Sequence, residues 1–196
     1  MGKGERTRVA VLERATEISS RLGLSGLTIG ALAGSTGLSK SGVYAHFLSK
    51  EELQLATLRY AREAFVDQVL RPALSAPRGG PRLRAFFERW LERARTAVPA
   101  CCVYLAARVE FGGQPGPVRD QLAQDYRDLL DSIGQMVRAA VAEGHFRPEV
   151  DPARVAQDLD GIVMGFFFAY RLLGDPELER RARESFASMM AAARRG

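Results

Sequence analysis

The chain has 196 residues, of which 46% are hydrophobic and 26% are charged, and this ordinary globular balance excludes a disordered chain. Its net charge of +5 gives the surface a mild preference for polyanions such as nucleic acid. The chain has two cysteines, Cys101 and Cys102, and because they are neighbours in sequence a secreted disulfide scaffold is excluded.

No segment has the pattern of a secretory signal or of a membrane span. The first eight residues, MGKGERTR, carry charges that no apolar stretch follows. The most apolar run, residues 161–173, contains Arg171 and is shorter than the ~20 residues that a spanning helix needs. We therefore expect a cytoplasmic protein with no membrane partner.

Apolar residues recur at helical spacing from end to end, and no segment alternates with the period of two that indicates a β-strand. The sequence therefore predicts an all-α fold of about nine helices. In chain order, an apolar stripe predicts a first helix over residues 6–22. This helix is expected to end at Gly23, because glycine commonly follows a helix C-terminus.

Two short helices are predicted next. Thr28 is a suitable N-cap for a helix that runs to about residue 34, and Ser39 is a suitable N-cap for another over residues 40–46. Gly37 lies between the two helices and can turn the chain sharply.

A long fourth helix is predicted over residues 49–70. Ser49 and Glu52 have the spacing of a capping box, and Leu48 and Leu53 flank them at the spacing of a hydrophobic staple. The proline that follows two positions after this range sets its expected end.

Proline and glycine divide the remaining chain. Residues 72–81, PALSAPRGGP, are expected to form a loop, which is a candidate boundary between modules. Two Asp-Pro pairs each supply an N-cap followed by a proline in the first helical turn. Five further helices are predicted over residues 83–99, 101–111, 115–144, 152–173 and 176–194.

The first three helices have the arrangement of a helix-turn-helix, in which two short helices joined by a glycine turn rest on a third. Helical spacing places an apolar set inward, namely Ile29, Leu32, Ala33, Leu38, Val43 and Phe47. It leaves a second set outward, namely Lys40, Ser41, Gly42, Tyr44 and His46. Cations, hydroxyls and aromatic rings of this kind contact phosphate oxygens and base edges.

The segment LTIGALAGSTGLSKSGVYAHFLSKEEL resembles the helix-turn-helix of the TetR family of transcriptional repressors. The well-matched part covers residues 9–58, and the remainder is similar only in length and helix order. The resemblance implies a DNA-binding domain over residues 1–48 and a helical ligand-binding and dimerisation domain over residues 49–196, joined by the long fourth helix. The matching positions are Thr28, Leu32, Ala33, Gly37, Ser39, Val43, Tyr44, His46, Phe47, Lys50 and Leu53.

By this resemblance, Thr28 and Lys50 contact the phosphates of a double-stranded DNA operator, and Ala45 offers a methyl contact to thymine. Side chains that contact phosphates set the position of the protein on DNA and not its choice of sequence. Base reading is implied mainly for Lys40, Ser41, Gly42, Tyr44 and His46.

The sequence also departs from the family pattern, because glycine occupies positions 30, 34 and 42, where many relatives carry a polar or basic side chain. Base reading by side chains is therefore expected to be sparse. A larger share of the binding free energy is expected from phosphates, from DNA shape and from a basic arm formed by Lys3, Arg6 and Arg8.

The second module is rich in aromatic residues, which can either line a cavity or form an ordinary core. Periodicity does not separate these two readings. The resemblance implies that this module holds a small-molecule inducer. The candidate ligand-binding residues are Phe86, Phe87, Trp90, Tyr104, Arg108, Phe111, Tyr126, Phe166, Phe167 and Tyr170.

The predicted helix over residues 152–173 is apolar on more than one face, which is typical of a helix that packs on its own module and on a partner. A purely internal helix is the alternative. The resemblance assigns the last two helices to a homodimer, whose two-fold axis requires a palindromic operator, and it implies that the protein is a repressor. The candidate interface residues are Val155, Leu159, Ile162, Ala169, Leu172, Phe186, Met189 and Met190.

Two other classes of function remain open. Glu110 and Arg108 can be read as a catalytic acid and its partner, but no histidine, serine or second carboxylate stands at a spacing that completes a site. We therefore expect no enzyme, and salt bridges for these two residues. An architectural or activating DNA-binding protein without a ligand is the second alternative.

Metal and redox chemistry have weak signals. His46 and His145 have no third ligand at metal-binding spacing, so we expect neither a metal nor a cofactor. Cys101 and Cys102 can sense oxidants or pack as small apolar residues, and packing is the simpler interpretation.

Overall fold

The computed structural model describes residues 2–96 and 99–194; the side chains of Lys3 and of residues 99–102, which include Cys101 and Cys102, lie outside the description. In this part of the chain every regular element is helical, apart from one isolated β-bridge between Phe146 and Arg194. The all-α prediction is therefore confirmed.

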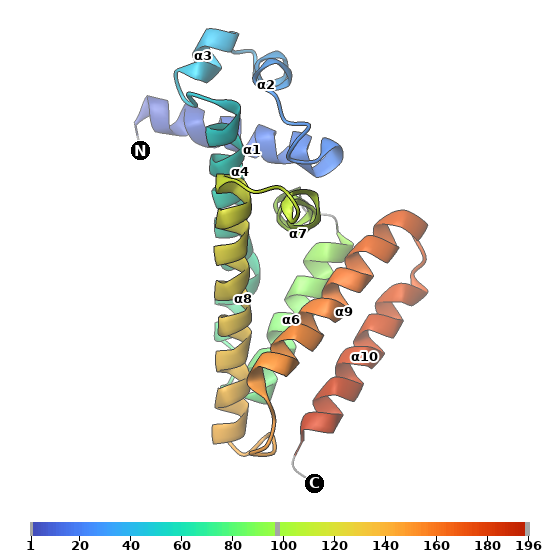
Figure 1. Cartoon of the computed structure of the whole chain (residues 1–196). Helices are drawn as coiled ribbons and strands as arrows, with labels where there is room; N and C mark the ends of the chain where they lie inside the picture. The colour runs from blue at the N-terminus through green and yellow to red at the C-terminus, as the bar shows by residue number, and fades with distance from the viewer. Residues whose placement is uncertain (1, 97–98, 195–196) are drawn as a thin grey trace. The chain divides into compact units, whose positions relative to one another are not determined.

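The helices follow one another as shown in Figure 1: α1 Lys3–Leu22, α2 Ile29–Thr36, α3 Lys40–Tyr44, α4 Lys50–Phe65, a π-helical segment Val66–Leu70, α5 Arg71–Leu74, α6 Gly80–Arg95, α7 Pro99–Phe111, α8 Pro117–Ala142, α9 Pro152–Leu173 and α10 Glu177–Ala193. Among the described helices, none is both long and apolar enough to cross a bilayer.

The chain forms two compact units. The first unit combines residues 1–65 with residues 98–124, and the second combines residues 66–97 with residues 125–196. In the first unit α7 packs against α1 and α4, while α2 packs against both α1 and α3. In the second unit α6, α9 and α10 pack side by side (Figure 1).

The N-terminal helices of the first unit share one apolar core, which the inward set of the sequence pattern predicts. Leu38 is half-buried and packs against this core. The fully or nearly fully buried members of the set are Ile29, Leu32, Ala33, Val43 and Phe47. A hydrogen bond also links α4 to α1: the hydroxyl of Tyr60 donates to Glu13 Oε1 across 3.4 Å. Burial, and then the Glu13 carboxylate, raise the pKa of Tyr60, so this hydroxyl keeps its proton.

The core of the second unit is built from aromatic rings. Phe87 on α6 and Phe186 on α10 stack with their ring centroids 3.9 Å apart and their planes almost parallel. Phe86 and Trp90, one helical turn apart on α6, lie with their centroids at 5.5 Å. All four rings are buried, and burying each one stabilises the unit by roughly 1.5–3 kcal/mol or more.

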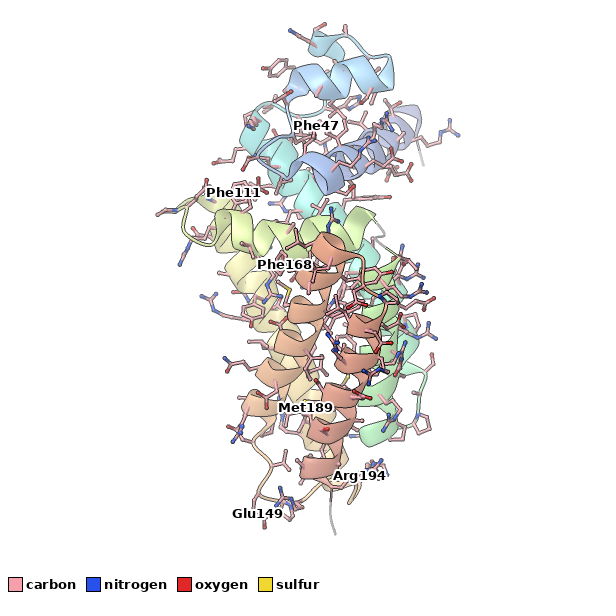
Figure 2. All side chains as sticks on the ribbon, turned by 90° about the vertical axis from the view of Figure 1, so that its right-hand side faces the viewer. Phe47, Phe111, Glu149, Phe168, Met189 and Arg194 are labelled. Carbon is pink, nitrogen blue, oxygen red and sulfur yellow. The ribbon has the colours of Figure 1, made fainter. Side chains whose placement is uncertain are left out.

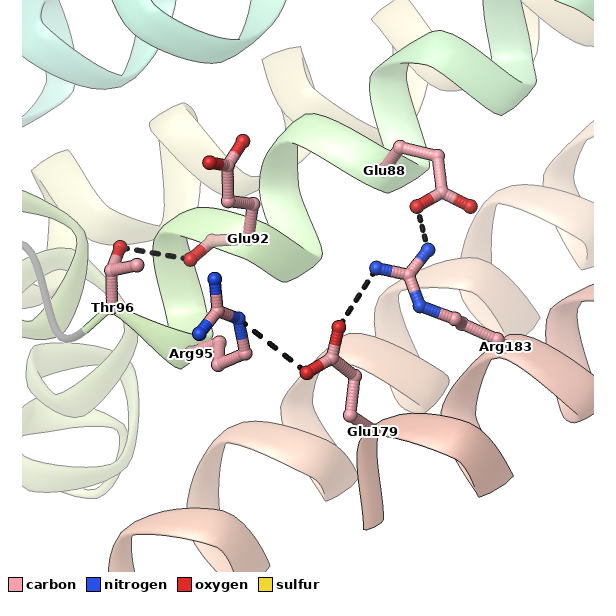
Figure 3. A network of polar contacts seen from close by, with 6 residues as sticks. All are labelled: Glu88, Glu92, Arg95, Thr96, Glu179 and Arg183. Carbon is pink, nitrogen blue, oxygen red and sulfur yellow. Dashed lines mark hydrogen bonds and ion pairs between the residues drawn. The ribbon is translucent and has the colours of Figure 1, made fainter. Parts of the chain in front are cut away.

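An ion network on the surface of the second unit also joins α6 to α10 (Figure 3). The guanidinium of Arg183 donates to Glu88 and, across 2.8 Å, to Glu179 Oε1. Arg95 Nε lies 3.4 Å from the other oxygen of Glu179. These side chains are partly exposed, so each pair contributes less than about 1 kcal/mol and the stacked rings dominate the packing.

Three of the predicted N-cap residues form capping hydrogen bonds at the starts of their helices. The side chains of Thr28 and Ser39 accept from the N–H groups of Ala31 and Gly42, and Asp151 Oδ1 accepts from the N–H of Ala153. These three caps are confirmed, because each satisfies a backbone donor that has no partner inside its helix.

Gly37 and the capping box hold the turns on either side of α3. Gly37 has φ +70° in the left-handed region, which glycine adopts without strain, and it turns the chain between α2 and α3. At the start of α4, Ser49 Oγ accepts from the N–H of Glu52, and Glu52 Oε2 accepts from the N–H of Leu48. The Ser49 half of the predicted capping box is therefore formed, while Glu52 binds the N–H one residue before the N-cap. The hydrophobic staple is wrong, since Leu48 is 82% exposed and Leu53 is buried.

The sequence predicts that the helix ends before Pro72, but the chain stays helical through this proline. Instead α4 gives way to the π-helical segment after Phe65, and the short helix α5 includes Pro72. Proline in an α-helix lacks a donor and collides with the carbonyl four residues earlier. A wider turn just before it avoids that collision. The predicted loop over residues 72–81 is therefore wrong for its first three residues, which belong to α5, and for its last two, which belong to α6.

Candidate nucleic-acid interface

One face of helix α3 is buried in the core of the first unit, and the opposite face is exposed to solvent. Val43 and Phe47 are completely buried in the core of the first unit. Lys40, Ser41, Tyr44 and Ala45 are exposed, and Tyr44 keeps 48% of its surface accessible. Gly42 and His46 are only half-buried. The helix therefore presents an ammonium, a hydroxyl, a phenol and a methyl group to an external partner.

The N-terminal ends of α2 and α3 lie close together. A methyl group at Gly30 would lie 3.7 Å from Lys40 Cε and 4.0 Å from Thr28 Oγ1. The exposed side chains of Thr28 and Lys40 therefore border one small space, into which Gly30 contributes no side chain. A hydroxyl and an ammonium beside the N–H groups of a helix start suit an anion such as phosphate.

Besides Thr28, whose side chain caps α2, two further predicted contact residues, Ser41 and Lys50, already have partners. The hydroxyls of Ser39 and Ser41 lie 2.9 Å apart. Lys50 Nζ donates to the carbonyl oxygen of Ser25 across 2.7 Å. An ammonium has three donors, so Lys50 retains the capacity to bind a phosphate while it holds this carbonyl.

Arg8 does not belong to a basic arm. The chain is helical from residue 3, and Arg8 Nη1 donates to the carbonyl oxygen of His46 across 2.6 Å. Its guanidinium carbon also lies 4.5 Å from the ring centroid of Phe47. The prediction of a basic arm is wrong for Arg8, because Arg8 instead fixes the end of α3 by a hydrogen bond and a cation–π contact. Arg6 is exposed, and the side chain of Lys3 lies outside the described residues.

Two side chains that no sequence pattern assigns to this site, Gln54 and Glu110, hold the loop between α1 and α2. The carboxylate of Glu110 on α7 accepts from the N–H groups of Leu24, at 2.8 Å, and Ser25, at 2.7 Å. Gln54 Nε2 on α4 donates to the carbonyl oxygen of Leu24 at 3.0 Å. No local pattern identifies Glu110, because its partners are about 85 positions away in the sequence.

The ten candidate ligand-binding residues are divided between the two units. Tyr104, Arg108 and Phe111 belong to the first unit, where the ring of Tyr104 stacks on Phe65 at 5.8 Å. The other seven belong to the second unit, namely Phe86, Phe87, Trp90, Tyr126, Phe166, Phe167 and Tyr170. In that unit Phe166 stacks on Tyr170 at 5.1 Å.

A groove of about 590 Å³ opens elsewhere in the second unit. Its walls include Arg84, His145, Phe146 and Met190, and it contains none of the ten candidate residues. Gly80 donates its N–H to His145 Nδ1 across 3.2 Å at the edge of this groove. Among the described residues, no group of three or more histidine, cysteine or acidic side chains is arranged to hold a metal.

Half of the predicted dimer residues are buried within their own unit. Phe186 is 1% exposed because it stacks on Phe87, and Val155, Leu159 and Met190 are also buried. The side chains of these four residues are covered by their own unit, so the apolar surface open to a partner comes from the other predicted residues.

The other half of the predicted dimer residues remain accessible. Ile162, Ala169 and Met189 are half-buried, and Leu172 is 83% exposed. The exposed apolar surface of α9 also includes Phe168 and Leu173. Figure 2 labels Phe168 on α9 and Met189 on α10.

Two family models match the chain. Residues 11–57 match a model described as bacterial regulatory proteins, tetR family. Residues 79–186 match the tetracyclin repressor-like C-terminal domain. A comparison with curated proteins finds no match.

Solved structures of similar fold cover almost the whole chain. A TetR transcriptional regulator from Chloroflexus aurantiacus is 26% identical, with a TM-score of 0.86 and coverage of 97% of this chain and 96% of that one. A TetR-family regulator from Cytophaga hutchinsonii is 19% identical, with a TM-score of 0.86 and coverage of 100% and 98%. AibR, solved in complex with isovaleryl coenzyme A and operator DNA, is 22% identical, with a TM-score of 0.77 and coverage of 93% and 97%.

Proposed function

Because the chain belongs to the TetR family of bacterial transcriptional regulators, we propose that it is a cytoplasmic, homodimeric repressor that a small-molecule inducer releases from a palindromic operator. In this proposal residues 1–48 form the DNA-binding domain and residues 49–196 form the ligand-binding and dimerisation domain. The family is one of transcription regulators and not of enzymes.

The observation that carries the proposal is the exposure of α3 on a buried anchor. Lys40 and Tyr44 face outward while Val43 fixes the helix from below, which is how a recognition helix enters the major groove. Lys40 and Tyr44 then read base edges, and the methyl group of Ala45 contacts thymine. Thr28 and Lys50 bind the flanking phosphates.

A second copy of the chain covers the exposed apolar surface of α9 and α10. This surface includes Phe168, Leu172 and Leu173 on α9, together with the half-buried Met189 on α10. Exposed aliphatic and aromatic side chains on neighbouring helices are typical of a protein interface. Two-fold symmetry then places two recognition helices about 34–36 Å apart, or a multiple of that distance, on a palindromic site.

The inducer acts by preferring the dimer conformation in which the recognition helices are misplaced. AibR, which shares the fold, was solved with both isovaleryl coenzyme A and operator DNA, and this supports a ligand-responsive regulator. A coupling free energy of about 1–3 kcal/mol changes DNA affinity by roughly 5- to 150-fold.

The test separates phosphate contacts from base contacts. Operators are first selected from random duplexes, and affinities are then measured by fluorescence anisotropy over a range of salt concentrations. Lys50→Ala should weaken binding to all sequences similarly and lower the slope of log affinity against log salt by about 0.9, which is the loss of one phosphate contact. Tyr44→Ala should lower affinity mainly at the operator, by about 1–3 kcal/mol.

Arg78→Ala is the matched control for lost charge, because Arg78 is an exposed cation of the second unit that pairs weakly with Glu143. It should leave both the affinity and the salt slope close to those of the wild type. A purified protein that ignores duplex DNA even in dilute salt contradicts the proposed function.

A further inference from the structure

The loop between α1 and α2 has no regular structure at Leu24 and Ser25, yet side chains bind all of the backbone polar groups of these two residues. Glu110 accepts both N–H groups, at 2.8 and 2.7 Å. Gln54 donates to the Leu24 carbonyl at 3.0 Å, and Lys50 donates to the Ser25 carbonyl at 2.7 Å. Backbone groups find their partners in backbone, side chains or water, and in this loop side chains supply a partner for each of the four groups.

The backbone conformation of Gly23, at the start of the loop, is what allows the contact with Glu110. Gly23 has φ +77° and ψ 162°, a conformation that is essentially restricted to glycine. A Cβ atom at this position would lie 2.9 Å from Glu110 Oε1. The glycine therefore permits both the turn and the close approach of the carboxylate, whose two charge-assisted hydrogen bonds are stronger than neutral ones.

The loop connects this carboxylate to two groups that matter for DNA. Leu27, which is completely buried, follows Ser25 closely and leads directly into Thr28, the N-cap of α2. On the other side, the Ser25 carbonyl holds the ammonium of Lys50. A displacement of Ser25 therefore moves both phosphate-binding groups of the proposed interface.

We propose that Glu110 is a positioning residue for DNA binding, and that its carboxylate, by holding the N–H groups of Leu24 and Ser25, fixes Lys50 and Thr28 at the phosphates. This role rests on the proposed function. Glu110 lies on α7 and makes no contact with DNA itself. Its effect passes through the loop, so it depends on the presence of the Lys50 ammonium.

Glu110→Gln is the test variant, because the amide keeps the size of the side chain but leaves only one acceptor for two N–H donors. Amide hydrogen exchange at Leu24 and Ser25 should become at least about tenfold faster, since a charged acceptor is lost. Operator affinity should fall roughly tenfold, and the salt slope should fall by as much as about 0.9. Glu92→Gln on the exposed surface of α6 is the isosteric control and should change none of these quantities.

A double-mutant cycle distinguishes positioning from a general structural role. In the Lys50→Ala background, Glu110→Gln should lower operator affinity by clearly less than it does in the wild type, because the group that it positions is gone. Glu110→Asp, which keeps two acceptor oxygens on a shorter arm, should lie between the wild type and Glu110→Gln. A merely structural residue would give additive losses and an unchanged salt slope.

The outcomes separate this inference from the function on which it rests. If the wild type binds its operator and Glu110→Gln binds it equally well, or if the two amides exchange at wild-type rates, the positioning role is refuted and the regulator remains. If the wild type binds no duplex, the proposed function fails and the positioning role fails with it.

Discussion

The polar contacts around α3 and the α1–α2 loop of the first unit differ in kind from those that join α6 to α10 in the second unit. In the first unit, side chains bind backbone: Glu110 holds the N–H groups of Leu24 and Ser25, and Arg8 holds the carbonyl of His46. In the second unit, the network of Arg183 with Glu88 and Glu179 joins one side chain to another on the surface (Figure 3). The first pattern fixes the course of the chain, whereas the second links helices whose backbones are already satisfied.

This difference follows from helix length. Helices α2 and α3 have eight and five residues, too few for stability on their own, so their ends and loops need partners from elsewhere. Helices α6, α9 and α10 have 16, 22 and 17 residues and pack through long apolar faces. A DNA-contacting surface requires fixed backbone, and the first unit obtains it from distant side chains.

The largest expected effect compares one buried ring from each unit. Phe47→Ala and Phe87→Ala should each lower the free energy of unfolding by about 3–5 kcal/mol in urea denaturation, because each leaves a cavity. At temperatures where both variants are folded, only Phe47→Ala should lose operator binding, since Phe47 supports α3 and Arg8. Equal losses of DNA affinity would contradict the proposed division of roles.

Two glycine-to-alanine substitutions should change the stability by smaller amounts, and in opposite directions to each other. Gly23→Ala should cost about 1–3 kcal/mol of stability, because it forces a glycine-only conformation and displaces Glu110. Gly34→Ala on α2 meets nothing within 4 Å and should stabilise the protein by about 0.5–1 kcal/mol, since alanine is the better helix former. Thermal denaturation of the two variants measures both changes, and a loss of stability in Gly34→Ala would show that α2 has other constraints.

The smallest effect is expected for the ion network of the second unit. Arg183→Ala should lower the free energy of unfolding by less than about 1 kcal/mol, because its partners are partly exposed to solvent. Denaturation at low and high salt measures this difference, which should shrink as salt is added. A loss above 2 kcal/mol would mean that the network, and not the stacked rings, holds α6 to α10.

Local chemistry made most of the helix boundaries predictable. The caps at Thr28, Ser39 and Ser49 each accept from a donor three positions away, so the local sequence contains both partners. The turn at Gly37 was predictable for a similar reason, because glycine is the residue that most readily adopts its left-handed conformation. The buried face of the helix-turn-helix could also be predicted, because helical periodicity identifies the apolar side of each helix.

Features that depend on distant partners could not be predicted in this way. Glu110 meets the N–H group of Leu24 only once the chain has folded. The contacts of Arg8 with Phe47 and His46 likewise join residues that are far apart in the sequence. Periodicity also identifies an apolar face without saying what covers it. Phe186 therefore reads equally well as an interface residue and as the internal partner of Phe87, and the structure shows that it is internal.

The anchoring of α3 separates two tasks among neighbouring residues. Val43, Phe47 and the Ser39 cap hold the helix, and none of them is needed to choose a DNA sequence. Lys40, Tyr44 and Ala45 face outward and support little of the fold. Under the proposed function, new operator preferences can therefore be selected from libraries that vary these three positions, with nearly every member expected to fold, so that a single scaffold can be retargeted to unrelated promoters.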